Sequence, residues 1–92
     1  MLKVVAAAII MDNRIWHLPP PNRHSNVIHA VVEKLGKRFI NAGPDAQGFM
    51  ISDGTYATRA KAYEIAVAAD QLLKDDPRVP YVPGELFSED VW

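Results

Sequence analysis

The sequence predicts an α+β fold in which two β-hairpins are each followed by an α-helix, with an antiparallel sheet packed against the two helices. Two turn signals, Asp12-Asn13 and Asp53-Gly54, each separate a pair of short strand-like segments. A segment of helical periodicity follows each pair. Because the chain has 92 residues and no cysteine, a single domain over residues 1–92 without disulfides is expected.

The first hairpin is expected to use residues 3–10 and 14–18. Residues 3–10 (KVVAAAII) are apolar at successive positions, which is typical of a central strand covered on both faces. Residues 14–18 (RIWHL) form the returning strand. The prolines at 19–21 end the ladder, because proline has no backbone N–H to donate, and they hold the chain extended.

The first helix is expected to begin after an N-cap at Asn22. Gly36 either ends this helix or lies one turn before its end. Five apolar residues fall on one stripe at about 100° per residue. They are Val27, Ile28, Val31, Val32 and Leu35.

The second unit repeats this order. Residues 41–46 are predicted to be a loop, 47–52 and 55–57 a hairpin, and 59–74 an Ala-rich helix with its N-cap at Thr58. The inner stripe of this helix is expected to consist of Ala62, Ile65, Ala66, Ala69, Leu72 and Leu73.

The last nine residues, 84–92, are too apolar for a free end. They contain Leu86, Phe87, Val91 and Trp92. We expect this tail to pack on the domain or on a neighbouring subunit, because buried apolar surface stabilises the fold.

Two arginines stand at the predicted helix openings, Arg23 and Arg59. A helix N-terminus presents unpaired N–H groups and a partial positive charge, so an arginine there opposes the helix dipole unless an anion binds. The two openings are therefore candidate phosphate sites. The alternative is that both arginines pair with acidic tail residues, namely Glu85, Glu89 or Asp90.

His24 is predicted to face inward, because it lies within about 60° of the apolar stripe of the first helix. It is either a structural histidine bonded to backbone or a ligand donor at the mouth of the fold. The spacing of His17, His24 and His29 matches no common zinc pattern, and no metal, cofactor or catalytic residue is predicted.

The second helix carries an apolar strip away from its inner stripe. Tyr63 and Val67 are four residues apart, and Arg59 lies one turn before Tyr63. The strip is either an oligomer contact, together with Trp92, or a binding wall on which a base could stack. A homo-oligomer is expected because a chain this short has a thin core.

Other partner classes are disfavoured. The net charge of −1 argues against direct binding of duplex nucleic acid. The N-terminal apolar run is far shorter than the roughly 20 residues of a membrane span, and nothing looks like a signal peptide. No membrane partner is expected, and a reducing cytoplasm suits a chain without cysteine.

The chain resembles a group of small proteins from tailed phages and prophages, and the resemblance spans most of its length. The group has a P-x-R-H-H-x-x-I helix opening, a Q-G-F-x-x-S-x-G hairpin and a terminal L-F/Y-S-E-D-L/V-W/Y. The matching pieces here are Asn22-Arg23-His24 with Val27-Ile28, then Gln47-Gly48-Phe49 with Ser52 and Gly54, then Arg59, Ala62, Ile65-Ala66, Ala69 and Gln71, and finally Leu86 to Trp92.

This pattern is similar to the phage sponge proteins that counter Thoeris defence. The resemblance implies an oligomeric protein, in the cytoplasm of the infected bacterial host, that sequesters glycocyclic ADP-ribose or a cyclic oligonucleotide without breaking it. It implies ligand-binding roles for Asn22, Arg23, His24, Phe49, Arg59 and Tyr63. Ser25 stands where a second His is usual and Asp70 where Gly is usual, and both departures are expected to weaken nucleotide binding.

Two other functions remain open from the sequence. One is a small enzyme acting on a nucleotide, with His24 and a carboxylate of the Ser88-Glu89-Asp90 stretch as the acid–base pair. The other is a protein-interaction module that docks a host protein through Tyr63, Val67 and Trp92.

Overall fold

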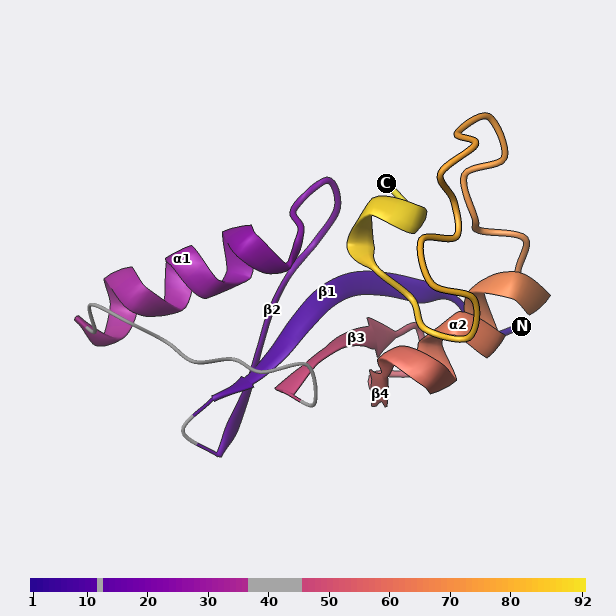
Figure 1. The fold of residues 1–92 in the computed structure, drawn as a ribbon. Coiled ribbons are helices and arrows are strands. Elements are labelled where there is room, and N and C mark those ends of the chain that lie inside the picture. The colour runs from indigo at the N-terminus through magenta and orange to yellow at the C-terminus, as the bar shows by residue number, and fades with distance from the viewer. Residues whose placement is uncertain (12, 37–45) are drawn as a thin grey trace.

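The computed structural model describes residues 1–11, 13–36 and 46–92, and it confirms the α+β fold class (Figure 1). The sheet is antiparallel throughout, with the strand order β2-β1-β3-β4. The elements in chain order are β1 Val4–Met11, β2 Arg14–Leu18, α1 His24–Leu35, β3 Gln47–Ile51, β4 Tyr56–Thr58, α2 Arg59–Ala68 and the 3-10 helix η2 Ser88–Asp90.

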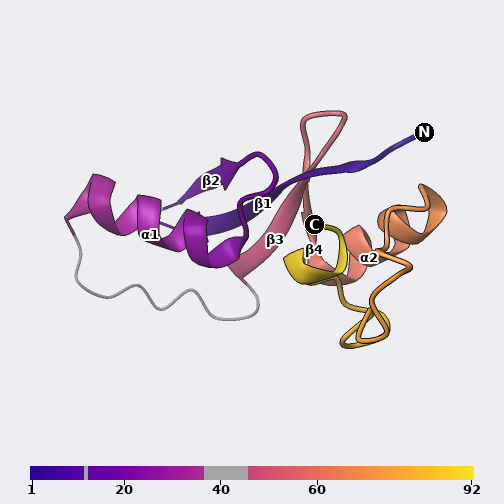
Figure 2. The same ribbon diagram turned by 90° about the horizontal axis from the view of Figure 1, so that it is seen from above.

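Both helices lie on one face of the sheet. Helix α1 packs on β1 and β2, and α2 packs mainly on β3 and β4. The C-terminal turn that contains η2 lies between the two helices, as the views from the side and from above both show (Figures 1 and 2). The tail therefore lies between the helices, where its last residue, Trp92, packs against both core clusters.

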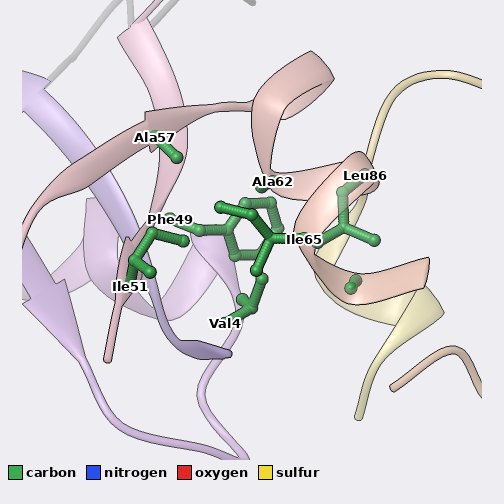
Figure 3. Close-up of a cluster of buried hydrophobic side chains, with 8 residues drawn as sticks. Val4, Phe49, Ile51, Ala57, Ala62, Ile65 and Leu86 are labelled. Atoms are coloured by element: carbon green, nitrogen blue, oxygen red, sulfur yellow. The ribbon is translucent and has the colours of Figure 1, made fainter. Parts of the chain in front are cut away.

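The core has two parts that meet under the tail. The larger one surrounds Phe49, as Figure 3 shows, and holds Val4, Phe49, Ile51, Ala57, Ala62, Ile65, Ala66 and Leu86. The smaller one lies under α1 and holds Ala7, Ile9, Val27 and Val31. The indole of Trp92 packs against both, so the last residue of the sequence joins the two halves of the core.

The β1 segment was expected to be covered on both faces, and the structure confirms this only at the centre of the strand, since Ile10 on the second face is 40% exposed. Residues paired across antiparallel strands share a face. Ala7 is paired with Phe49 and so faces the helices, whereas Ala8 is paired with Gly48 and faces away. Within the described ranges, no helix lies over that second face. Ala8 is nevertheless inaccessible to solvent.

Helix α1 begins one residue later than predicted, because Arg23 rather than Asn22 takes the N-cap position. The Asn22 amide instead turns back and donates to the carbonyl of Pro19 at 2.9 Å. The backbone N–H of Arg23 donates to the Asn26 side chain at 2.8 Å. Gly36 ends the helix in the left-handed region, with φ 68°.

Helix α2 has the predicted N-cap, since the Thr58 hydroxyl accepts from the N–H of Lys61 at 3.2 Å. It ends at Ala68 instead of reaching residue 74, and Asp70 turns the chain with φ 58°. The turn lets the Gln71 side chain bind the main chain of Val4, accepting from its N–H and donating to its carbonyl, each at 2.8 Å. Gln71 thus supplies β1 with two bonds like those of a neighbouring strand.

Two predicted connections fall wholly or partly outside the described residues. The first is the turn at Asp12-Asn13, of which Asp12 lies outside the described residues. Its neighbour Asn13 has φ 59°, which suits a tight turn. The loop predicted at residues 41–46 lies outside the described residues except for Ala46.

Candidate functional site

Both helices begin beside the start of β3. The His24 ring, at the first residue of α1, lies 2.7 Å from the carbonyl oxygen of Gly48 through Nε2. Arg59, at the first residue of α2, donates from Nη2 to the Gln47 side chain at 2.7 Å. We call this region, with Asn22 and Arg23, the helix junction.

His24 faces inward as predicted and is only 7% exposed. Its Nε2 must carry the proton that it shares with the Gly48 carbonyl, which leaves Nδ1 as an acceptor. Burial lowers the pKa of His24 below its usual 6.5, and the positive charge of Arg59 lowers it further. The hydrogen bond to Gly48 and the negative charge of Glu89 raise the pKa, but the net shift is downward. The ring is therefore neutral at neutral pH.

Arg23 binds the end of the tail. Its Nε and Nη2 both donate to the main-chain oxygen of Trp92, at 3.2 and 2.8 Å. The Trp92 indole Nε1 donates in turn to the main-chain oxygen of Asn22 at 2.7 Å. Asn22 and Arg23 therefore hold the tail in place over the opening of α1.

Arg59 lies under the tail rather than pointing outward. Its guanidinium carbon is 4.5 Å from the centre of the Phe87 ring, a cation–π contact. Its carbonyl accepts from the N–H of Leu86 at 3.0 Å. The Nε atom of Arg59 is buried and has no hydrogen-bond partner among the described residues. A buried donor of this kind has the capacity to bind an acceptor.

The two arginines contact the tail, but not through its carboxylates as the alternative prediction supposed. Within the described ranges, their guanidinium groups contact the Trp92 main chain, the Phe87 ring and the Gln47 side chain. Asp90 has a structural role that was not predicted from the sequence. Its carboxylate is fully buried and accepts from the N–H groups of Phe87 at 2.9 Å and Tyr81 at 3.3 Å.

The other predicted site residues are spread over different environments. Phe49 is fully buried and touches His24 and Trp92 edge-on, at centroid distances of 4.9 and 6.2 Å. Tyr63 is half-buried and packs against the larger core cluster, whereas Val67 is 49% exposed. The structure therefore brings Asn22, Arg23, His24 and Arg59 to the junction with Phe49 beneath them, and it leaves Tyr63 and Val67 along α2.

A family model described as phage T4 y16D protein matches residues 3–92. The chain belongs to the phage T4 y16D protein family. It is a small phage protein, in agreement with the coarser part of the resemblance seen in its sequence. No curated protein and no solved structure matches the chain.

Two kinds of feature are missing from the parts of this y16D-family protein that the structure describes. Residues 1–11, 13–36 and 46–92 contain no group of three or more His, Cys, Asp or Glu side chains that could hold a metal ion. In the same ranges, no helix is both long and apolar enough to cross a membrane.

Proposed function

We propose that this y16D-family protein is a phage-encoded anti-defence protein that sequesters a nucleotide-derived immune signal in the cytoplasm of the infected bacterium. Glycocyclic ADP-ribose and cyclic oligonucleotides are the candidate ligands, and they are bound without being broken. The observation that supports this proposal is the helix junction, where the N-termini of both helices lie beside the start of β3. There the Arg59 guanidinium contacts Gln47, and the Arg23 guanidinium contacts the Trp92 main chain.

The junction suits an anion for electrostatic reasons. Each helix N-terminus contributes unpaired N–H groups and the positive end of a dipole. A guanidinium has five N–H donors, and Arg23 uses two groups, Nε and Nη2, on the Trp92 oxygen. The buried Nε of Arg59 adds a donor that lacks a partner in the described part of the chain. A phosphate group would satisfy these donors.

His24 favours binding over turnover. Its ring is neutral and buried, and its Nε2 is engaged by the Gly48 carbonyl. The Asp90 carboxylate, one candidate partner for acid–base chemistry, is taken up by two main-chain N–H groups. These contacts give His24 and Asp90 positioning roles, which are what a binding site requires.

We also propose that the protein works as a homo-oligomer through the open face of its sheet, on the side away from the helices. The cross-strand pairs place nine residues there, and none has a side chain with a formal charge when histidine is neutral. They are Ala6, Ala8, Ile10, Ile15, His17, Gly48, Met50, Tyr56 and Thr58. An antiparallel sheet face that meets water is normally polar.

A second copy is the occupant that best fits this face. An uncharged surface buried against a charged one would leave unpaired charges out of water, which is costly. A two-fold axis instead places the same uncharged face on both sides of the contact. Ile10 and Ile15, which are paired with each other, are 40% and 46% exposed and lie at one end of the face.

The ligand proposal is tested by calorimetric titration with cyclic ADP-ribose isomers and cyclic oligonucleotides. Arg23→Ala and Arg59→Ala should each weaken binding roughly ten- to a hundredfold, since an arginine–phosphate bond is worth about 1.5–3 kcal/mol. Arg14→Ala is the matched control, because Arg14 stacks on Trp16 in the first hairpin. Chromatography of the recovered ligand should show it intact.

Three results would count against the proposal. Tight binding by both arginine variants would show that the arginines only hold the tail. Conversion of the ligand would identify an enzyme. Capture of a host protein that is lost in Val67→Lys, without any nucleotide binding, would identify an interaction module.

A further inference from the structure

The tail forms one wall of a pocket next to the helix junction. The pocket has a volume of about 410 Å³ and is lined by Tyr81, Val82, Phe87 and Glu89. Its size falls in the range of roughly 300–1,000 Å³ that is usual for small-molecule sites. The rings of Tyr81 and Phe87 stand at 89° to each other with centroids 6.3 Å apart.

The pocket is held in shape by a buried carboxylate. The Asp90 side chain is 0% exposed, and it binds the main-chain N–H of Phe87 through one oxygen and that of Tyr81 through the other. An isolated bridge pairs Val82 with Glu85 between these two anchors. The backbone at Tyr81 and at Phe87 is therefore held in place by contacts within the chain.

The lining defines the chemistry of an occupant. Three of the four lining residues offer apolar or aromatic surface, on which a flat ring can pack. The fourth, Glu89, ends in a carboxylate, and an ionised carboxylate only accepts hydrogen bonds. No lysine or arginine lines the pocket within the described ranges. A flat ring with an N–H donor at its edge matches this combination.

The pocket shares residues with the surroundings of the helix junction. Phe87 lines the pocket, and its ring also contacts the Arg59 guanidinium, whose carbon lies 4.5 Å from the ring centre. The Glu89 charge is close enough to His24 to influence its protonation. A ligand with a ring in the pocket would thus have its remaining groups within reach of the basic side of the junction.

We infer that this pocket binds the base of a nucleotide, with an exocyclic amino group directed at the Glu89 carboxylate and the phosphate directed towards Arg59. The inference rests on the proposed function and narrows the ligand to nucleotides whose base carries an amino group. A base with an oxo group at that position would place a lone pair against the carboxylate and should therefore bind more weakly.

Titration with two mononucleotides tests this assignment. Adenosine and inosine monophosphates differ at one purine edge, where the first has an amino group and the second an oxo group. The parent protein should bind the adenine form about tenfold more tightly, the effect of one hydrogen bond to a charged group. Glu89→Gln should lose this preference, because a glutamine amide can also donate to the oxo group. Glu85→Gln, on an exposed residue of the same tail, is the control.

The outcomes separate this inference from the proposed function. Equal binding of the two nucleotides by the parent, or a preference that Glu89→Gln retains, overturns the pocket assignment. The function still stands in that case if Arg59→Ala weakens binding. Failure of both mononucleotides to bind at millimolar concentration also overturns the assignment, and titration with the cyclic ligands then decides the function separately.

Discussion

Arg23 and Trp92 are joined by two hydrogen bonds to a single main-chain oxygen, although they lie 69 positions apart in the chain. The Trp92 indole Nε1 donates a hydrogen bond to the main-chain oxygen of Asn22. The residues that open α1 and those that end the tail therefore form one unit. A substitution in the tail should consequently affect both the stability of the fold and the geometry of the helix junction.

We expect Trp92→Ala to be strongly destabilising. The indole packs on both core clusters and meets Phe49 edge-on. Because it is only partly buried, the loss should be about 2–4 kcal/mol, towards the lower side of what large-to-small core substitutions cost. That corresponds to a fall in Tm of roughly 10 °C or more for a domain of this size. Thermal unfolding followed by circular dichroism measures it.

Two further variants make this result specific. Trp92→Phe keeps an aromatic ring but removes the Nε1 bond to Asn22, so it should cost about 1 kcal/mol. Leu73→Ala is the control, since Leu73 is 39% exposed. If Trp92→Ala melts like the parent, then the tail contributes nothing to stability, and Trp92 is not joined to Asn22 and Arg23 in solution.

The parts of the fold that depend on local chemistry could be predicted from the sequence. Strand β2 has the predicted bounds, because it lies between a turn signal and a run of prolines that cannot continue the ladder. The N-cap at Thr58 was also predictable, since its hydroxyl binds an N–H only three residues away. His24 faced inward as the helical period required.

The sequence-based predictions were wrong where the structure depends on contacts between residues that lie far apart in the chain. Helix α2 stops early, and the turn that follows it lets Gln71 bind Val4, which lies 67 positions away and is not indicated by any local pattern. The placement of Arg59 on the Phe87 ring is equally non-local. Phe49 lies in a segment that reads as an ordinary strand, so its complete burial beneath the junction followed only from the pairing of β3 with β1 and β4.

The stability of the protein should fall as the pH drops below 6.5, because of His24. Burial lowers the pKa of its ring in the folded state. Above pH 6.5 the ring is neutral in both states, and His24 contributes no pH dependence. Below pH 6.5 the unfolded chain takes up a proton that the folded ring does not. The free energy of unfolding then decreases, by at most about 1.4 kcal/mol per pH unit for one group, until the pH passes the folded pKa.

Urea denaturation at pH 7.5 and 5.5 measures this effect. The parent should be less stable at the lower pH, and His24→Gln should lose most of that difference. His29→Gln should behave like the parent, since the His29 side chain is 75% exposed. A parent that is equally stable at both pH values would show that His24 does not titrate with a lowered pKa.

The open sheet face should mediate a weak dimer. Four strands about 4.8 Å apart, each with about five residues at 3.3 Å, give a face of roughly 300 Å². A standard interface buries about 800 Å² per partner, so we expect a weak dimer with a dissociation constant in the micromolar range. Light scattering at increasing protein concentration should show the average mass rising from one chain towards two.

Two lysine substitutions compare this face with the rival surface on α2. Ile15→Lys places a charge on the open sheet face and should weaken association at least tenfold, because the lysine would be buried against an uncharged copy of the same face. Val67→Lys places the same charge on the exposed side of α2 and should leave association unchanged. Both positions are 46–49% exposed, so neither change should unfold the monomer. If Val67→Lys weakens association and Ile15→Lys does not, the contact lies on α2 at Val67. If the measured mass stays at one chain up to about 100 μM, any dissociation constant lies well above that concentration, and self-association through either surface is contradicted.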